Sequence, residues 1–169
     1  ANDPPKGPVF VSLPVDVMEQ ETDNRATGPG GLNRDTRPDP AGVAALVKLL
    51  LAAKNPVLVA GDDVARAGAD EALVALAELV GAAVWFEGLR QHVSFPTAHP
   101  NARAGLPNTA SAIAQALDGA DLVLLIGGSF FEELWFEAGS PFPTGAKVAQ
   151  IEAAHQNLGF NFSLEVGLV

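Results

Sequence analysis

The feature that most constrains the fold is an apolar run of strand length in the second half of the chain. Residues 122–126 read Leu-Val-Leu-Leu-Ile, and the run ends in Gly127, Gly128 and Ser129. A short run that is apolar at every position is typical of a strand buried on both faces, as in a parallel sheet covered by helices. Ligands of open α/β sheets bind beyond the carboxyl ends of such strands. The run therefore predicts the centre of a sheet with a crevice at its glycine-rich end.

Strand and helix patterns alternate along most of the chain. Asp39, followed by proline, predicts the N-cap of a first helix. Gly81 predicts the C-cap of a second helix over about 64–80, and Thr109 the N-cap of a third through Leu117. Strands are expected over 8–16, 57–60, 83–86, 122–126, 146–151 and 166–169. The alternation predicts an α/β fold: a doubly wound, mainly parallel six-stranded sheet with helices on both faces, nucleotide-binding-like in architecture.

Apolar periodicity predicts which helix faces are buried. The inward positions of the first two helices are expected to be Val43, Leu46, Val47, Leu50 and Leu51, then Leu73, Leu76 and Val80. Between Glu87 and Asn108 no period is visible, so this segment is expected to be a long functional or interface-forming loop.

The N-terminal part differs in composition from the rest. A strand over 8–16 closed by proline is followed by residues 19–38, which are polar, aperiodic and interrupted by glycines, as in a linker. A strand that leads at once into a linker has no partner nearby. We therefore expect residues 1–18 to be the end of an upstream domain, 19–38 to be a linker and 39–169 to be the main domain.

Charge and cysteine content exclude several classes of function. The formal net charge of −10 disfavours general binding to nucleic acid or to anionic membranes. No apolar run reaches the roughly 20 residues of a membrane span, and the N-terminus lacks a signal-peptide pattern. Without cysteine there are no disulfides, iron–sulfur clusters or thiolate zinc sites. A cytoplasmic location is expected.

Three turns that follow strands carry glycine, but no phosphate-binding or nucleophile motif is complete. Glycines in such turns either cradle a phosphate or simply end the strand. The acidic pairs 62–63 and 132–133 are read either as metal or acid–base groups, or as favourable charges at helix starts. His92, His99 and His155 lack ligand spacing, and His99 is interpreted as a loop hydrogen-bonder. No catalytic residues and no metal site are predicted.

An aromatic cluster follows the central strand. It consists of Phe130, Phe131, Trp135 and Phe136. Core packing or a subunit contact is the favoured interpretation, and the lining of a pocket is the alternative.

Several segments together resemble thiamine diphosphate-dependent enzymes of 2-oxo acids, the family that includes benzoylformate decarboxylase and acetolactate synthase. Residues 7–16 resemble the end of the family's N-terminal, pyrimidine-binding domain. Residues 55–61 (Asn-Pro-Val-Leu-Val-Ala-Gly), 95–100 (Phe-Pro-Thr-Ala-His-Pro), 120–127 and 150–152 resemble its central domain. Val84-Trp85 and the Phe-Pro-Thr-x-His-Pro loop are most similar to benzoylformate decarboxylase. The implied fold is the nucleotide-binding-like, DHS-type domain.

The resemblance implies that the parent enzyme binds thiamine diphosphate and Mg²⁺ through its two other domains. The activating glutamate and the Gly-Asp-Gly…Asn motif of the family belong to those domains, and this chain contains neither. We therefore expect a non-catalytic scaffold fragment that does not itself bind thiamine diphosphate or Mg²⁺. Its expected partners are the other domains of the parent chain and identical subunits, with no nucleic acid and no membrane.

Cofactor-binding positions follow from the crevice and the resemblance. Leu134 stands where benzoylformate decarboxylases carry an active-site histidine, and Ala154 stands where flavin-binding relatives carry an acid. The alternative function is an FAD- or NAD-binding module in the same crevice, with FAD binding disfavoured by these departures. A pure interaction domain is a third possibility. The candidate cofactor-binding residues are Gly61, Asp62, Arg90, Gly127, Gly128, Ser129 and Glu152.

Overall fold

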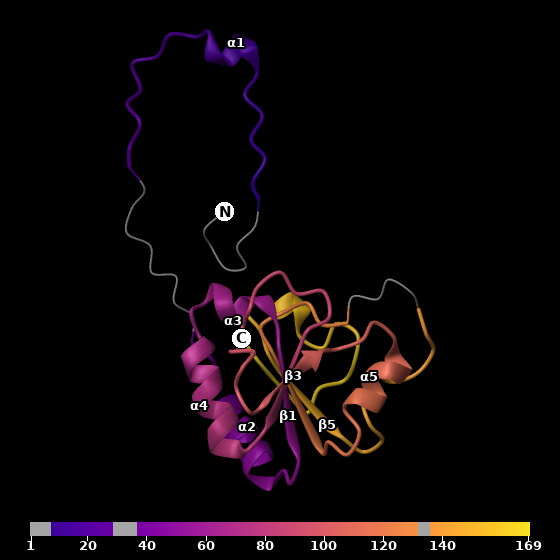
Figure 1. Ribbon diagram of the computed structural model, residues 1–169. Helices are drawn as coiled ribbons and strands as arrows, with labels where there is room; N and C mark the ends of the chain where they lie inside the picture. Colours follow the sequence, from indigo (N-terminus) through magenta and orange to yellow (C-terminus); the bar gives the residue numbers. More distant parts are fainter. Residues whose placement is uncertain (1–7, 29–36, 132–135) are drawn as a thin grey trace. The chain divides into compact units, whose positions relative to one another are not determined.

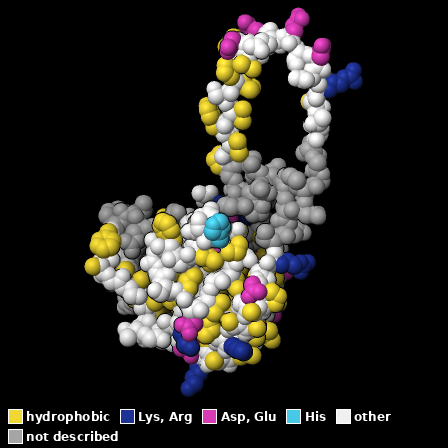
Figure 2. All heavy atoms as spheres, turned by 180° about the vertical axis from the view of Figure 1, so that it is seen from behind, with side chains coloured by type: hydrophobic (Ala, Val, Ile, Leu, Met, Phe, Trp, Pro, Cys, Tyr) yellow, Lys and Arg dark blue, Asp and Glu magenta, His cyan; other side chains and the backbone are white. Residues whose placement is uncertain are grey.

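The computed structural model describes residues 8–28, 37–131 and 136–169, in two units, Ala1–Thr36 and Arg37–Val169. In the first unit, the described residues form one short helix, α1 (Val15–Met18), and the predicted strand over 8–16 is wrong. Strands need a hydrogen-bonding neighbour, and the described part of this unit supplies none. Hydrophobic side chains follow its N-terminal arm and lie exposed to solvent (Figures 1 and 2).

The second unit is a single parallel sheet with the strand order β3-β2-β1-β4-β5-β6 (Figure 1). This confirms the predicted six-stranded α/β fold. The chain runs from β1 outward to β2 and β3, then crosses back from β3 to β4 on the other side of β1. The strand order therefore reverses at the β1–β4 boundary, which is the switch point of the sheet. The elements are α2 (Pro40–Ala52), β1 (Pro56–Ala60), α3 (Asp62–Arg66), α4 (Asp70–Val80), β2 (Ala83–Phe86), β3 (Ala102–Gly105), α5 (Ala110–Ala116), β4 (Leu122–Ile126), β5 (Lys147–Ile151), the 3-10 helix η1 (His155–Asn157) and β6 (Val166–Leu168).

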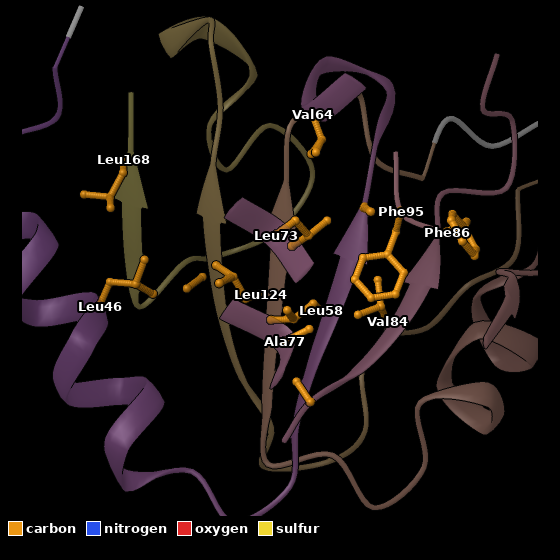
Figure 3. Close-up of a cluster of buried hydrophobic side chains, with 13 residues drawn as sticks. Leu46, Leu58, Val64, Leu73, Ala77, Val84, Phe86, Phe95, Leu124 and Leu168 are labelled. Atoms are coloured by element: carbon orange, nitrogen blue, oxygen red, sulfur yellow. The ribbon is translucent and has the colours of Figure 1, made fainter. Parts of the chain in front are cut away.

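Two hydrophobic clusters lie on opposite faces of the sheet because successive strand residues point to opposite sides. On one face Leu58 and Leu124 pack with residues of α2, α3 and α4 (Figure 3). On the other face Val59 and Leu125 pack with Ile113 of α5. Helices therefore cover both faces, as predicted.

Helix α2 begins as predicted, but it buries fewer of its apolar side chains than predicted. The Asp39 carboxylate accepts a hydrogen bond from the Gly42 N–H at 3.0 Å, which confirms the N-cap. Leu46 is buried, whereas Val43, Val47 and Leu51 are exposed, so the predicted face is wrong in part. The helix lies against β6, the last strand of the sheet, and one edge strand covers only one side of a helix. No helix in the described ranges is long and apolar enough to cross a membrane.

One predicted helix and one predicted loop differ from the structure. The helix predicted over 64–80 is divided into α3 and α4 at Gly68, whose φ of +65° is incompatible with a continuous right-handed helix. The segment predicted as a loop contains β3, whose Ala-Arg-Ala-Gly sequence has no apolar run to reveal it. Gly81 is confirmed as the C-cap of α4. Thr109 occupies the N-cap position of α5, but its side chain makes no capping bond to the helix.

Candidate functional site

The crevice at the switch point is closed by backbone packing between two glycine turns. The Gly61 N–H donates to the Ile126 carbonyl at 2.9 Å, and the Asp63 N–H donates to the Gly127 carbonyl at 2.8 Å. A Cβ atom on Gly61 would overlap the Gly127 carbonyl oxygen and lie 2.8 Å from the Gly128 Cα. Glycine is therefore required here because the ends of β1 and β4 approach each other, a sufficient role without any ligand.

Asp62 fastens the long loop after β2 to the end of β1. Its carboxylate accepts from the Gln91 N–H at 2.9 and 3.0 Å and from the His92 N–H at 2.9 Å. Burial raises the pKa of the Asp62 carboxyl, but these two donors, the His92 ring and Arg66 together outweigh burial and leave the pKa below its ordinary value. Buried Ser94 adds a second tie, donating from Oγ to the Gly61 carbonyl at 2.6 Å.

Replacing Asp62 with alanine is expected to loosen this loop. The amides of Gln91 and His92 lose their acceptor, so hydrogen–deuterium exchange at both should accelerate by about tenfold, as expected for the loss of a charged hydrogen bond worth about 1.5 kcal/mol. Asp63→Ala is the matched control, since Asp63 pairs with Arg66 at 2.8 Å and its side chain makes no hydrogen bond to the loop. Equal exchange in the two variants would show that Asp62 does not hold the loop.

Glu152 is a buried carboxylate at the end of β5, beside the same turns. It accepts from the Gly128 N–H at 3.2 Å and from the Ala153 N–H at 2.8 Å. Burial raises the pKa of this carboxyl and the negative charge of Asp63 adds to the increase, while the backbone N–H groups of Ala153, Gly128 and Ala154 offset it only in part. The switch point therefore gathers three carboxylates, those of Asp62, Asp63 and Glu152.

The raised pKa of Glu152 predicts a pH-dependent contribution to stability. The folded chain holds this proton more tightly than the unfolded chain, so the contribution is fully present below the ordinary value of 4.5 and is lost as the pH rises through the folded pKa. Urea unfolding of wild type and Glu152→Gln from pH 4 to pH 8 should show wild type gaining stability relative to the variant as the pH falls. Glu165→Gln, at a half-exposed position, controls for the loss of one charge. A difference that is independent of pH, or that has the opposite slope, would contradict this assignment.

The Arg90 and Ser129 side chains do not join the other five candidate residues. The Arg90 guanidinium stacks on the Phe86 ring, 4.7 Å from its centroid, and borders Gly105 on the β2–β3 side of the sheet. Ser129 is exposed and faces a separate cavity. The structure thus brings together Gly61, Asp62, Gly127, Gly128 and Glu152. Their role in cofactor binding stays a prediction.

Other predicted candidates are placed as follows. His99 is a loop hydrogen-bonder, as interpreted: its Nδ1 accepts from the Asn101 N–H, and its Nε2 lies 3.2 Å from a Glu78 carboxylate oxygen. Glu132, Glu133, Leu134 and Trp135 lie outside the described residues. Among the residues that the structure describes, no three His, Asp or Glu side chains come together as a metal site.

The cavity beside Ser129 has a volume of about 550 Å³ and lies at the carboxyl ends of β4 and β5. We call it the aromatic cavity. The sequence predicts an aromatic cluster that includes Phe130 and Phe131. Phe160 and Phe162 also line the cavity, but they lie too far along the chain for the sequence to connect them with that cluster. The lining residues are Ser129, Phe130, Phe131, Phe136, Glu137, Gly139, Pro141, Gln150, Asn157, Phe160, Asn161 and Phe162.

A dinucleotide phosphate does not fit the switch-point crevice as built. In nucleotide-binding sheets the N–H groups at the start of the first helix bind the phosphate. Here the Asp63 N–H already donates to the Gly127 carbonyl, and the Gln91 and His92 amides already donate to Asp62. Three carboxylates lie nearby, two of them paired with Arg66 and one of these, Asp62, also beside the His92 ring, and together they disfavour a diphosphate.

Comparison with known proteins identifies relatives of this chain. Residues 43–169 match the family model described as thiamine pyrophosphate enzyme, central domain. The chain is 34% identical to a benzoylformate decarboxylase of Pseudomonas aeruginosa, over 92% of this chain and 31% of that protein. It is 32% identical to an acetolactate synthase of Mycobacterium bovis, over 96% of this chain and 27% of that protein.

Solved structures agree with the sequence matches. The structure of benzoylformate decarboxylase from Polynucleobacter necessarius aligns with a TM-score of 0.87 at 29% identity, covering 99% of this chain and 31% of that one. A 4-hydroxybenzoylformate decarboxylase from Rhodococcus jostii, described as thiamine diphosphate-dependent, aligns with a TM-score of 0.70 at 25% identity, covering 90% and 27%. The chain therefore spans less than a third of the length of these relatives.

Proposed function

The chain belongs to the thiamine pyrophosphate enzyme family through its central domain, and on this basis we propose that it serves as the scaffold of a benzoylformate decarboxylase-like enzyme acting on 2-oxo acids. The observation that carries the proposal is the 34% identity to a benzoylformate decarboxylase across nearly the whole chain. A carboligase is the other activity supported by the matches, through the acetolactate synthases. In either enzyme this domain positions its neighbours and does no chemistry itself.

Enzymes of this family depend on thiamine diphosphate, and we propose that the other domains of the parent enzyme bind it together with Mg²⁺. The donor set of the domain supports this division. Its buried carboxylate, Glu152, is engaged by backbone N–H groups, and Asp62 holds a loop. The described residues contain no group of side chains suited to a metal ion.

The exposed hydrophobic side chains of the first unit favour a binding partner outside this chain. Its large hydrophobic side chains are more than half exposed, which is costly unless another surface covers them (Figure 2). We propose that residues 1–18 pack with an upstream domain of the parent, that 19–38 link it to the domain over 39–169, and that the assembly includes identical subunits in the cytoplasm. The exposed hydrophobic residues are Val9, Phe10, Val11, Leu13, Val15, Val17 and Met18.

The alternative function, an FAD- or NAD-binding module, is disfavoured by the closed switch point and its three carboxylates. A thermal-shift titration of the chain with FAD and with NAD distinguishes the two. The proposed scaffold should melt at the same temperature with and without nucleotide, whereas a ligand present at 100 times its Kd would add about 2.7 kcal/mol of stability. A saturable rise in the melting temperature would favour the alternative.

Two experiments test the proposed function: sequencing the DNA on both sides of the coding segment, and assaying the full-length protein. We expect a downstream Gly-Asp-Gly…Asn segment, and the full-length protein should release CO₂ from benzoylformate or another 2-oxo acid when thiamine diphosphate and Mg²⁺ are added. The 169-residue chain alone should be inactive under the same conditions. Activity of the isolated chain, or a full-length protein inactive on every 2-oxo acid of a panel, would overturn the proposal.

A further inference from the structure

The two longest helices of the second unit leave apolar side chains in solvent. Helices α2 and α4 pack on the same face of the sheet through one shared hydrophobic cluster (Figure 3). On their outward sides Leu51 of α2 is 80% exposed and Leu79 of α4 is 84% exposed, and Val43 and Val47 of α2 are exposed as well. Single exposed apolar residues are ordinary, whereas a group of them across two helices of one face is typical of a contact with another protein.

The buried sides of both helices fix the direction in which the outward sides point. Gly42 lets α2 lie close against β6, since a Cβ atom there would be 2.7 Å from Leu168 Cδ2. Ala77 of α4 is completely buried. Helix α2 leads into β1 and α4 leads into β2, and because these strands are parallel the two helices run in the same direction. Leu51 and Leu79 each precede the last residue of their helix, so both lie toward the same end of the sheet.

The charged residues stand on opposite flanks of the two outward sides. With 3.6 residues per turn, the outward side of α2 carries Val43 and Val47 on one flank and Lys48 on the other. On α4 the order is reversed: Glu78 lies on the flank that corresponds to the valines, and Leu79 lies on the flank that corresponds to the lysine. Among the described residues Lys48 forms no ion pair, and the Glu78 side chain is 62% exposed.

From this pattern we propose that the outward sides of α2 and α4 bind a second copy of this chain, with α2 of each copy against α4 of the other. A two-fold axis along the helices makes the facing helices parallel, and parallel helices bring opposite flanks together. Lys48 then lies beside the partner's Glu78, and Val47 beside the partner's Leu79. Pairing α2 with α2 would instead place two lysines together, and pairing α4 with α4 would place glutamates together, so charge selects the crossed arrangement.

The proposed contact is small. Helices of 13 and 11 residues are about 20 and 17 Å long, so the face they form is smaller than the roughly 800 Å² per partner of a stable interface. We therefore expect a weak dimer with a Kd on the order of 100 µM. This inference rests on the proposed function in one respect, since it names a surface for the identical subunits proposed there. Its test measures mass and no enzyme activity, so either proposal can fail alone.

Sedimentation equilibrium of the full 169-residue chain tests the proposal. In salt of about 0.15 M, which screens the net charge, the average mass should rise from that of one chain toward that of two between about 20 and about 500 µM. Leu51→Glu should weaken association at least about tenfold, because it places a charge in the apolar part of the contact. Lys48→Glu and Glu78→Lys should each weaken it by about two- to fivefold, and the double variant with both changes should regain the wild-type Kd.

A matched control separates this contact from the apolar arm of the first unit. Phe10→Glu makes the same kind of change at a side chain that is 91% exposed, and it should leave the association unchanged. Circular dichroism should show the wild-type fold for every variant, since each replaced side chain is exposed. A chain that stays monomeric throughout, association that Phe10→Glu abolishes or Leu51→Glu leaves unchanged, or a double charge variant no tighter than the single ones would each overturn the proposal.

Discussion

Replacing Gly61 with alanine is expected to destabilise the domain by about 3 kcal/mol or more, the upper range for overpacking a well-packed interior. The new methyl group would overlap the Gly127 carbonyl oxygen and come within 2.8 Å of the Gly127 carbonyl carbon and the Gly128 Cα. All three obstacles are backbone atoms at the end of β4, so no side-chain rotation relieves the clash. The two central strands would have to separate where they are most tightly joined.

Urea unfolding followed by circular dichroism measures this effect, and the melting temperature should fall by roughly 6–12 °C. Gly28→Ala is the control, because a Cβ atom there meets nothing within 4 Å. It should change stability by no more than about 0.5 kcal/mol. A Gly61→Ala protein that unfolds at the same urea concentration as wild type would show that the turns can move apart freely.

Replacing Leu124 with alanine should cost about 2–5 kcal/mol, the range for truncating a fully buried leucine. Leu124 is 0% exposed and lies in β4, in register with Leu58 of β1 and Ala149 of β5 (Figure 3). Both neighbours are themselves completely buried, and the helices of one face pack on all three. The surrounding side chains have little freedom to move into the space that the leucine side chain leaves, so a cavity remains.

The control for this substitution is Leu79→Ala on α4, where the side chain is 84% exposed. Both variants remove the same atoms, so their difference isolates the effect of burial. Calorimetry should show a clear fall in melting temperature for Leu124→Ala and almost none for Leu79→Ala. Equal losses would mean that the domain interior is not packed as the structure describes.

The sequence predicted the parallel sheet because its central strands are apolar at every position. Leu122–Ile126 and Pro56–Ala60 needed no tertiary information to be recognised. Strand β3 could not be found this way, since its side chains are small or charged and its pairing depends on β2 alone. The exposed side of α2 was misjudged because a helix whose one charged residue is Lys48 does not show which of its apolar faces meets the sheet.

The candidate site was predictable where strand order alone brings residues together. Gly61, Gly127 and Glu152 follow three adjacent strands, so their proximity follows from the parallel sheet. The hydrogen-bond partners of the residues around them were not predictable, because hydrogen bonds such as those from Gln91 to Asp62 join residues far apart in the chain. Asp121 was missed for the same reason: it accepts from the backbone N–H groups of Lys54 and Asn55 at 2.7 and 2.9 Å.

The central place of β1 also has a consequence during synthesis. β1 is the first strand of the sheet to be made, and β2 can pair with one of its edges soon afterwards. Its other edge belongs to β4, which leaves the ribosome only after the long loop, β3 and α5. Until then an apolar strand has unpaired N–H and C=O groups along one side, a template for pairing with other chains. A nascent chain halted before Leu122 is thus exposed to aggregation through the unpaired edge of β1.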